Sequence, residues 1–593
     1  MTKVHSFHIP VMGIGFTIDT PLKVAPYGIN SVISLVDDML LEKLRKMYCS
    51  KFEMPYNEIT EKINDFRAKR ITSYLDLIND LAQKKFENLK NFTFDSIADI
   101  KKYFEMLPEY SPLKQEFKQV TKEKFSLEEL KIWIKGHIQM GSIDVNIMTK
   151  VDKDNYIKKE KLPTEFNDAH AAVRGFANST LSSSLILSAG MNPRLYSYLE
   201  QFDDFYPDEN GIIPKKIVLK VSDYRSALIQ GKFLAKKGIW VSEYRIESGL
   251  NCGGHAFATD GYLMGPILEQ FKAEKENLRQ AVFEILTAAL VSKNRAIPKT
   301  TLSLQLSAQG GVGTSEEHNF ILNYYGIDTV GWGTPFLLVP EATTVDAATI
   351  KKLMDAKEKD LYLSNISPLG IPFHSLRGNT KDIEKDKRIA KGNPGSSCPK
   401  KFVALNKDFV ATGICTASRQ YQHLKIKELD AQDLDAATYA RQLHQITEKS
   451  CTCVGLGTSA LLAYDLDTKT EGKGVSICPG PNMAYFNKTM PLTEMVDHIY
   501  GRTNVISRTD RPHMFIKELH IYIPYLKDLM LENKTATNEK QYKYLLAFAA
   551  NLKDGITYYQ NLFYNEHAIL NDLKDAKNTL NEFILEIDLI EIS

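Results

Sequence analysis

The sequence predicts an α/β fold, a (β/α)8 TIM barrel with a large helical insertion and a mostly helical C-terminal domain. Eight apolar segments of strand type alternate with helical patterns over the first part of the chain. Glycine-rich turns follow the last two of these segments, at residues 309–314 and 331–334. In barrels of this class, the loops after the seventh and eighth strands commonly form a phosphate site. The two turns therefore favour a closed parallel barrel over an open sheet.

The bulk composition is that of a globular protein with more than one compact unit. The chain has 593 residues, of which 43% are hydrophobic and 25% are charged. Its net charge of +1 gives no electrostatic reason to expect nucleic acid or an anionic membrane as a partner. The N-terminal sequence lacks the apolar core of a signal peptide, and the most apolar helical run, residues 281–292, is too short to span a bilayer. The seven cysteines, an odd number, do not indicate a secreted disulfide scaffold, so we expect a cytoplasmic protein.

The expected strands are short apolar runs, as the buried strands of a parallel sheet should be. In chain order they are residues 10–15, 29–36, 143–148, 184–188, 216–221, 238–243, 302–306 and 327–330. Helical patterns separate them, for example at residues 227–237. A helix at about residues 346–357 is expected to close the barrel.

A helical insertion is expected between the second and third strands, over about residues 37–139. The segments there are long and charged, and one of them begins with Ser126 and Glu129 in the spacing of a capping box. We interpret the insertion as a lid or a contact with another subunit or protein partner, with its Lys and Glu side chains forming a solvated face.

The expected domains are a barrel over residues 1–375 and a C-terminal accessory domain over residues 376–593. Residues 364–401 are rich in Gly, Pro and Lys, which predicts a loop or linker. Helical spacing of apolar residues returns at 517–534, 539–563 and 568–587.

The two glycine-rich turns are the strongest functional signal. Successive βα units that end in glycines leave backbone N–H groups free to approach an anion, which predicts a phosphate-bearing cofactor. The alternative is that these glycines only allow close packing in a barrel without a ligand.

Several motifs, taken in order, resemble those of the nitronate monooxygenase family, historically called 2-nitropropane dioxygenases. That family of FMN-dependent TIM barrels also includes flavin-type enoyl-acyl-carrier-protein reductases and some quinone reductases. The matching segments are Pro10-Val11-Met12-Gly13 at the first strand, Asn146 in the third, Cys252-Gly253-Gly254-His255 in the sixth loop, Gln309-Gly310-Gly311-Val312 after the seventh strand and Gly333-Thr334-Pro335-Phe336 after the eighth. The resemblance covers roughly residues 5–345 without the insertion. In the family, alanines stand at the positions of Cys252 and Gln309, and an arginine at that of Pro335.

The resemblance implies FMN as the cofactor. Its phosphate would be held by the backbone N–H groups of Gly310, Gly311, Gly333 and Thr334. The flavin-binding set that it implies also contains Met12, Gly13, Asn146 and Gly254.

Two side chains are candidates for the chemistry. His255 follows two glycines at a strand end and could exchange protons with substrate as an acid or base, the alternative being a structural histidine. Lys220, in the fifth strand, could reach the flavin and stabilise developing negative charge.

The resemblance implies an oxidoreductase that transfers hydride or electrons between flavin and a small organic substrate. We expect oxidation of a nitronate-like substrate, as in a monooxygenase. The alternatives are reduction of an enoyl or quinone substrate with NAD(P)H, and a non-enzymatic partner protein that keeps the flavin barrel.

Cysteines form a second cluster in the sequence. Five of the seven lie in the C-terminal third, each near turn residues: Cys398, Cys415, Cys451, Cys453 and Cys478. Four of them could bind an iron–sulfur cluster or zinc, although their spacing matches no compact Cys-x2-Cys pattern. The alternative is that they are reduced thiols packed as small hydrophobic side chains.

Overall fold

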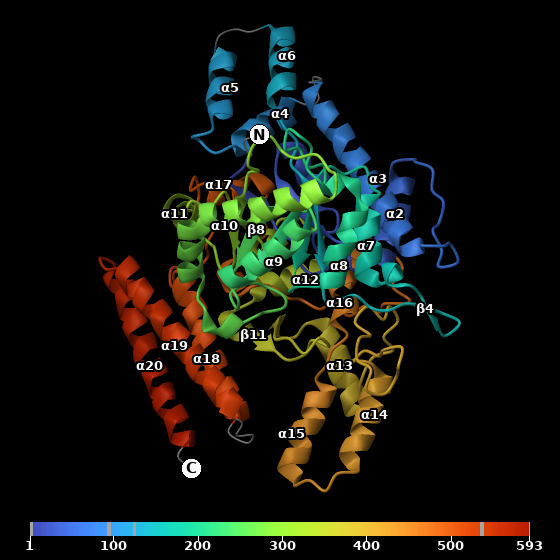
Figure 1. The fold of residues 1–593 in the computed structure, drawn as a ribbon, viewed down its shortest axis with the longest axis vertical. Helices are drawn as coiled ribbons and strands as arrows, with labels where there is room; N and C mark the ends of the chain where they lie inside the picture. The colour runs from blue at the N-terminus through green and yellow to red at the C-terminus, as the bar shows by residue number, and fades with distance from the viewer. Residues whose placement is uncertain (1–3, 92–96, 123–125, 189, 534–538, 592–593) are drawn as a thin grey trace.

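The computed structural model describes residues 4–91, 97–122, 126–188, 190–533 and 539–591, and in this part of the chain eight parallel strands close into a barrel (Figure 1). The strand order is β1-β10-β9-β8-β7-β6-β3-β2. The strands are β1 (Phe7–Ile9), β2 (Asn30–Ser34), β3 (Ile143–Met148), β6 (Ser184–Ser188), β7 (Lys216–Val221), β8 (Val241–Glu247), β9 (Gln305–Gln309) and β10 (Thr329–Gly331). The predicted fold class is confirmed.

Three strands are displaced from their expected positions. β1 ends before Pro10, whose missing N–H cannot contribute to a ladder, so the expected strand at residues 10–15 is wrong. Gly238 has a φ of +81° and ends the preceding helix, so β8 starts only at Val241. β9 likewise starts three residues after Leu302, and its last residue directly precedes the first glycine turn.

Helices between the strands bury one face each against the barrel. They are α1 (Thr20–Val24), α7 (Asp168–Ala177), α8 (Pro193–Tyr198), α9 (Tyr224–Lys236), α10 (Met264–Ser292), α11 (Ser315–Tyr325) and α12 (Ala347–Asp355). Thr314 caps α11 by accepting a hydrogen bond from the backbone N–H of Glu317. Among the described residues, no helix combines the length and the apolar character that a membrane crossing requires.

The insertion between β2 and β3 is helical, as expected. It consists of α2 (Asp38–Lys51), α3 (Phe66–Lys90), α4 (Ile97–Met106), α5 (Pro112–Lys122) and α6 (Leu127–His137). Ser126 and Glu129 form the predicted capping box. α3 belongs to the main core through Ile71 and Tyr74. Its last turns, with Phe86 and Leu89, join α4, α5 and α6 in a smaller core, and these three helices extend from one end of the molecule (Figure 1).

The C-terminal third starts with a hairpin of β11 (Leu361–Ser364) and β12 (Phe373–Leu376). The segment expected to be a loop contains a helix, α13 (Thr380–Ala390), which Asn379 caps by accepting the N–H of Asp382 at 3.0 Å. The abundance of Lys and Asp in this segment resembles a linker because most of the helix faces solvent. The remaining helices are α14 (Arg419–Asp430), α15 (Ala436–Thr447), α16 (Thr452–Ala463), α17 (Leu492–Ile499), α18 (Met514–Asn533), α19 (Glu539–Leu562) and α20 (His567–Glu591).

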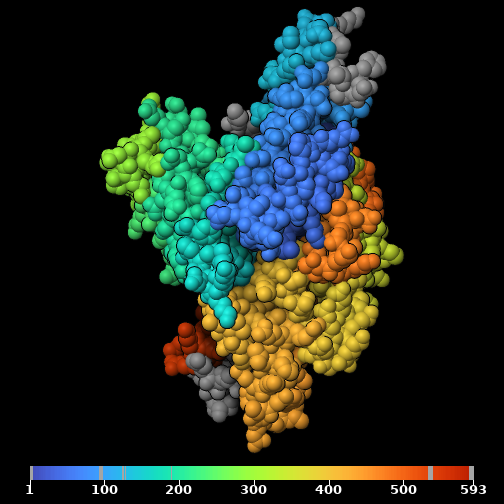
Figure 2. Space-filling view, turned by 90° about the vertical axis from the view of Figure 1, so that its right-hand side faces the viewer, coloured from blue at the N-terminus to red at the C-terminus, as the bar shows by residue number. Residues whose placement is uncertain are grey.

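The C-terminal third packs directly onto the barrel. The ammonium of Lys400 lies 2.5 Å from the carboxylate of Asp37 and 3.2 Å from that of Glu471, and all three side chains are almost completely buried. Apolar residues of both parts share one core. The surface of this region is continuous with that of the barrel (Figure 2). The C-terminal third is therefore in a position to contribute residues to the mouth of the barrel.

Candidate active site

A cavity of about 440 Å3 opens at the carboxyl ends of the barrel strands, where parallel barrels carry their chemistry. All ten catalytic and cofactor-binding residues predicted from the sequence line it: Met12, Gly13, Asn146, Lys220, Gly254, His255, Gly310, Gly311, Gly333 and Thr334. The C-terminal third contributes further lining residues, among them Ser367, Cys453 and Asn482. The structure thus brings the predicted residues together, and their roles stay predictions.

The glycine turn after β9 has a conformation that excludes side chains. Gly310 and Gly311 have φ values of +123° and +82°. A Cβ at Gly311 would lie 2.1 Å from the side-chain nitrogen of Asn251. Among the described residues, the backbone N–H groups of Gly310, Gly311, Gly333 and Thr334 have no hydrogen-bond partner. These free donors follow two adjacent strands, so they can converge on one anion.

Arg511 supports this turn from the C-terminal third. Its guanidinium donates to the carbonyl of Gly311 at 2.8 Å and pairs with Glu317 at 2.7 Å. The backbone N–H groups of Gly313 and Met514 donate to the same carboxylate. Burial acts to raise the pKa of Glu317, but Arg511 and these N–H groups hold it below its ordinary value. Arg511 lies about 200 residues from the turn in sequence, and no local pattern marks it.

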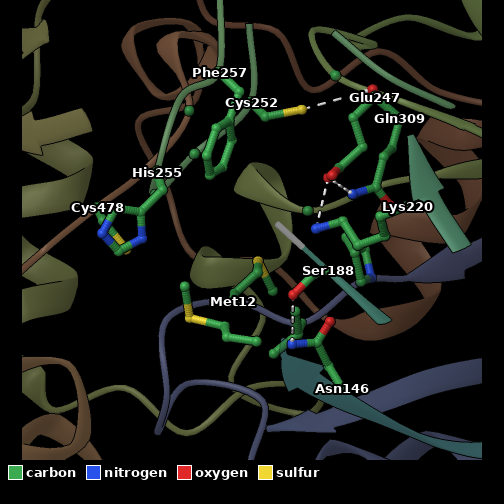
Figure 3. A pocket seen from close by; sticks show the side chains of 18 of the residues that line it. Met12, Asn146, Ser188, Lys220, Glu247, Cys252, His255, Phe257, Gln309 and Cys478 are labelled. Carbon is green, nitrogen blue, oxygen red and sulfur yellow. Dashed lines mark hydrogen bonds and ion pairs between the residues drawn. The ribbon is translucent and has the colours of Figure 1, made fainter. Parts of the chain in front are cut away.

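His255 lies in the cavity wall, half buried (Figure 3). Its Nε2 is 2.7 Å from the hydroxyl of Ser367, and its ring packs edge-on against Phe373 with centroids 4.9 Å apart. Burial lowers the pKa of His255 to about 4. The imidazole is therefore neutral at pH 7.

An ion pair occupies the opposite side of the cavity in the same view (Figure 3). The ammonium of Lys220, on β7, lies 2.7 Å from the carboxylate of Glu247, at the end of β8. Gln309, at the end of β9, donates to the same carboxylate. Sequence reasoning did not single out Glu247, although its place at a strand end before a glycine is the signal that could have identified it.

Three buried amide oxygens in the cavity wall have no hydrogen-bond partner among the described residues. They are Oδ1 of Asn146, Oδ1 of Asn251 and Oε1 of Gln309. The amide nitrogen of Asn146 is held by Ser188 at 3.4 Å (Figure 3). An unsatisfied buried acceptor costs about 1–3 kcal/mol. These oxygens are thus available to a ligand that carries hydrogen-bond donors.

The structure does not support the predicted metal site. All seven cysteines lie within the described residues and are free thiols. Cys398 forms a hydrogen bond with Cys415, and Cys451 forms one with Cys453. Cys478 is buried in the cavity wall. Across the described chain, no group of three or more His, Cys, Asp or Glu side chains is arranged to hold a metal ion. The five cysteines are therefore not shown to form one set of ligands, and the iron–sulfur or zinc site stays a prediction.

Two of the thiols that border the cavity, those of Cys252 and Cys478, are protonated. Burial raises the pKa of Cys478 to about 12, and it raises the pKa of Cys252 even further. Cys252 donates weakly to the carbonyl of Gln309, 3.6 Å away. Neither thiol is therefore a nucleophile at neutral pH.

No protein-family model matches the chain, and no curated protein matches its sequence. Among solved structures, FabK from Thermotoga maritima matches with 12% identity over 84% of this chain and 92% of that chain, with a TM-score of 0.36. The nitroalkane oxidase from Streptomyces ansochromogenes matches with 9% identity over 84% and 94%, with a TM-score of 0.33. The enoyl reductase domain of MlnA from Bacillus amyloliquefaciens matches with 14% identity over 68% and 89%, with a TM-score of 0.32. An enoyl reductase and a nitroalkane oxidase are thus among the solved structures to which this chain is similar.

Proposed function

We propose that this chain is a flavin-dependent oxidoreductase that binds FMN in the barrel cavity and acts on a small organic substrate. The observation that carries the proposal is the set of four unpartnered backbone N–H groups at Gly310, Gly311, Gly333 and Thr334, on the turns after adjacent strands. Such a set suits a phosphate group, because it supplies donors without a side chain in the way.

The rest of the cavity fits the remainder of FMN. The free oxygens of Asn146 and Gln309 can accept hydrogen bonds from ring or ribityl donors, and Met12 supplies apolar surface. When bound, FMN would supply the centre that accepts or delivers a hydride or single electrons. Lys220, whose ammonium has further donors besides the one that faces Glu247, can stabilise negative charge within the cavity.

Residues 478–482 of the C-terminal third cover the phosphate turns. The backbone N–H of Gly480 donates to the hydroxyl of Thr334 at 3.0 Å, and the amide of Asn482 donates to the carbonyl of Gly311 at 2.7 Å. A Cβ at Gly253 would lie 2.7 Å from the carbonyl oxygen of Cys478. This close cover reduces access of water to the phosphate end, which strengthens electrostatic contacts there.

The low pKa of His255 bears on which of the candidate reactions the cavity suits. Its pKa of about 4 makes it a weak base at pH 7, so proton abstraction from carbon gains little from it. This favours the second candidate, reduction of an enoyl or quinone substrate with NAD(P)H, over an oxidation that needs a base. Oxidation of a substrate that is already a carbanion, such as a nitronate, stays compatible with a neutral His255.

The proposal is tested with a matched pair of glycine variants. Gly311→Asp places a carboxylate in the phosphate turn, where it repels an anion by several kcal/mol in a partly buried site, and its Cβ also displaces the side chain of Asn251. Gly326→Asp makes the same charge change at an exposed helix end with φ +65° and no atom within 4 Å of the new Cβ. We expect FMN titration to show loss of binding in the first variant and wild-type affinity in the second. Equal FMN affinity in both variants would contradict the proposed phosphate site.

A further inference from the structure

The hydrogen bonds around Ser367 determine which nitrogen of His255 carries the proton. Ser367 lies between β11 and β12 and is completely buried. Its Oγ accepts the backbone N–H of Leu369 at 3.2 Å and lies 2.7 Å from Nε2 of His255. Among the described residues, the Ser367 hydroxyl has no other hydrogen-bond partner. Its single proton therefore has Nε2 as its acceptor.

The two tautomers of His255 differ in how well they satisfy this hydroxyl. If Nε2 carried the proton, it would donate to Ser367, and the serine proton would be left without an acceptor among the described residues. A buried donor without a partner disfavours that arrangement by roughly tenfold or more. If Nε2 is bare, it accepts the serine O–H, and the imidazole proton resides on Nδ1.

A neighbouring histidine provides an internal reference with the opposite tautomer. His374 follows Phe373, and its backbone N–H donates to the carbonyl of Gly254, beside His255. Its Nε2 lies 2.7 Å from the carbonyl oxygen of Leu250. A carbonyl can only accept, so Nε2 of His374 must carry the proton. Two histidines on neighbouring backbone segments are thus held as opposite tautomers by two kinds of partner, a hydroxyl and a carbonyl.

We propose that Ser367 is a positioning residue that fixes His255 as the Nδ1–H tautomer, so that the neutral ring presents a hydrogen-bond donor to the cavity. His255 lines the cavity, and within the described residues its Nδ1 has no partner. A neutral N–H donor stabilises negative charge that develops on an oxygen atom.

The tautomer suits one class of substrate, an inference that rests on the proposed function. A substrate with a carbonyl or nitro oxygen conjugated to the reacting carbon can accept a hydrogen bond from the Nδ1–H of His255. A hydrogen bond of this kind favours the substrate whose oxygen becomes more negative during the reaction. No proton needs to leave the ring.

The test is the 15N NMR spectrum of the full-length protein with labelled histidine. His255 and His374 are assigned by the loss of their signals in His255→Gln and His374→Gln. We expect the proton on Nδ1 in His255 and on Nε2 in His374. A proton on Nε2 of His255 in the wild-type protein overturns the proposal without any need for a Ser367 variant.

Ser367→Ala and Ser367→Thr test the cause. The alanine variant should show a mixture of His255 tautomers and a kcat at least about tenfold lower with an unsaturated carbonyl or nitro substrate, with KM little changed. The Ser367→Thr variant keeps the hydroxyl, so it should retain the Nδ1–H tautomer of His255 and the wild-type kcat. An unchanged tautomer in Ser367→Ala overturns the role of Ser367. Because the spectrum does not require flavin, a colourless protein with the expected tautomers contradicts the proposed function alone, and a yellow protein with Nε2–H at His255 contradicts this inference alone.

Discussion

Replacement of Arg511 by methionine removes the cation that ties the C-terminal third to the glycine turn after β9. The side chains of Arg511 and Glu317 are only 6% and 3% exposed, so the ion pair is almost fully removed from water. The variant leaves the carboxylate of Glu317 with the N–H groups of Gly313 and Met514 alone. Removal of one partner from a buried ion pair typically costs about 3–5 kcal/mol. We expect a loss of this size in the free energy of unfolding, measured with urea at pH 7.

FMN affinity should fall in the same variant. The guanidinium donates to the carbonyl of Gly311 and to the amide oxygen of Asn482, so both sides of the turn lose a fixed partner. The loss of one such charge-assisted bond corresponds to roughly a tenfold or larger increase in Kd for FMN. Isothermal titration with FMN measures it.

A double variant separates the charge effect from the loss of packing. Arg511→Met combined with Glu317→Gln leaves no unpaired carboxylate, while the glutamine oxygen still accepts one of the two N–H groups. It should recover a large part of the lost stability. The reasoning would be refuted if Arg511→Met unfolded within about 1 kcal/mol of the wild type. It would also be refuted if the double variant lost as much free energy of unfolding as Arg511→Met and Glu317→Gln lose in sum.

The pH dependence has a definite sign. In the wild type, the pKa of Glu317 is held low, so its contribution to stability is present above the unfolded pKa and is lost as pH falls through the folded value. In Arg511→Met, the buried carboxylate lacks its cation, and its pKa should rise above the unfolded value. The stability deficit of the variant should therefore narrow as the pH is lowered from 7 towards 5.

Two further predictions concern buried charges elsewhere in the C-terminal third. Lys400→Met leaves Asp37 and Glu471 without their shared cation and should lower the free energy of unfolding in urea by about 3–5 kcal/mol. Lys351→Met, at an exposed ion pair, should lower it by less than about 1 kcal/mol. Similar losses in both variants would contradict the stabilising role of the buried Lys400 cluster. Burial raises the pKa of Glu518 to about 7. The protonated side chain therefore contributes to folding stability fully below the unfolded pKa, and this contribution is lost as pH rises through 7. Glu518→Gln should flatten the stability profile between pH 5 and 8 by up to roughly 3 kcal/mol, and a profile that keeps its slope would exclude Glu518 as the titrating group.

Much of the fold follows from local sequence patterns. β3, β6 and β7 have the bounds that apolar periodicity predicts, because each is a buried run between clear turn signals. β1 and β8 are shifted because Pro10 and Gly238 impose backbone constraints that a hydrophobic pattern does not register. The helix α13 was missed because its surface is almost entirely polar.

The candidate site also contains residues that local sequence signals indicate and residues that they do not. Glycine turns and the residue after a glycine pair are local signals, so Gly311 and His255 could be found from sequence. Ser367 and Arg511 act through contacts with residues about 112 and 200 positions away, and nothing in their own segments indicates those contacts. The predicted cysteine ligands stay a prediction, since among the described residues no group of three or more potential ligands is arranged to hold a metal ion.

The visible absorption spectrum of the purified full-length protein tests the central claim most directly. We predict the near-ultraviolet and blue bands of oxidised flavin, from about one FMN per chain, either as purified or after incubation with FMN and gel filtration. This expectation rests on the cavity and on its four N–H donors at Gly310, Gly311, Gly333 and Thr334, which have no partner among the described residues. A protein that is colourless as purified and takes up no FMN under these conditions would contradict the account.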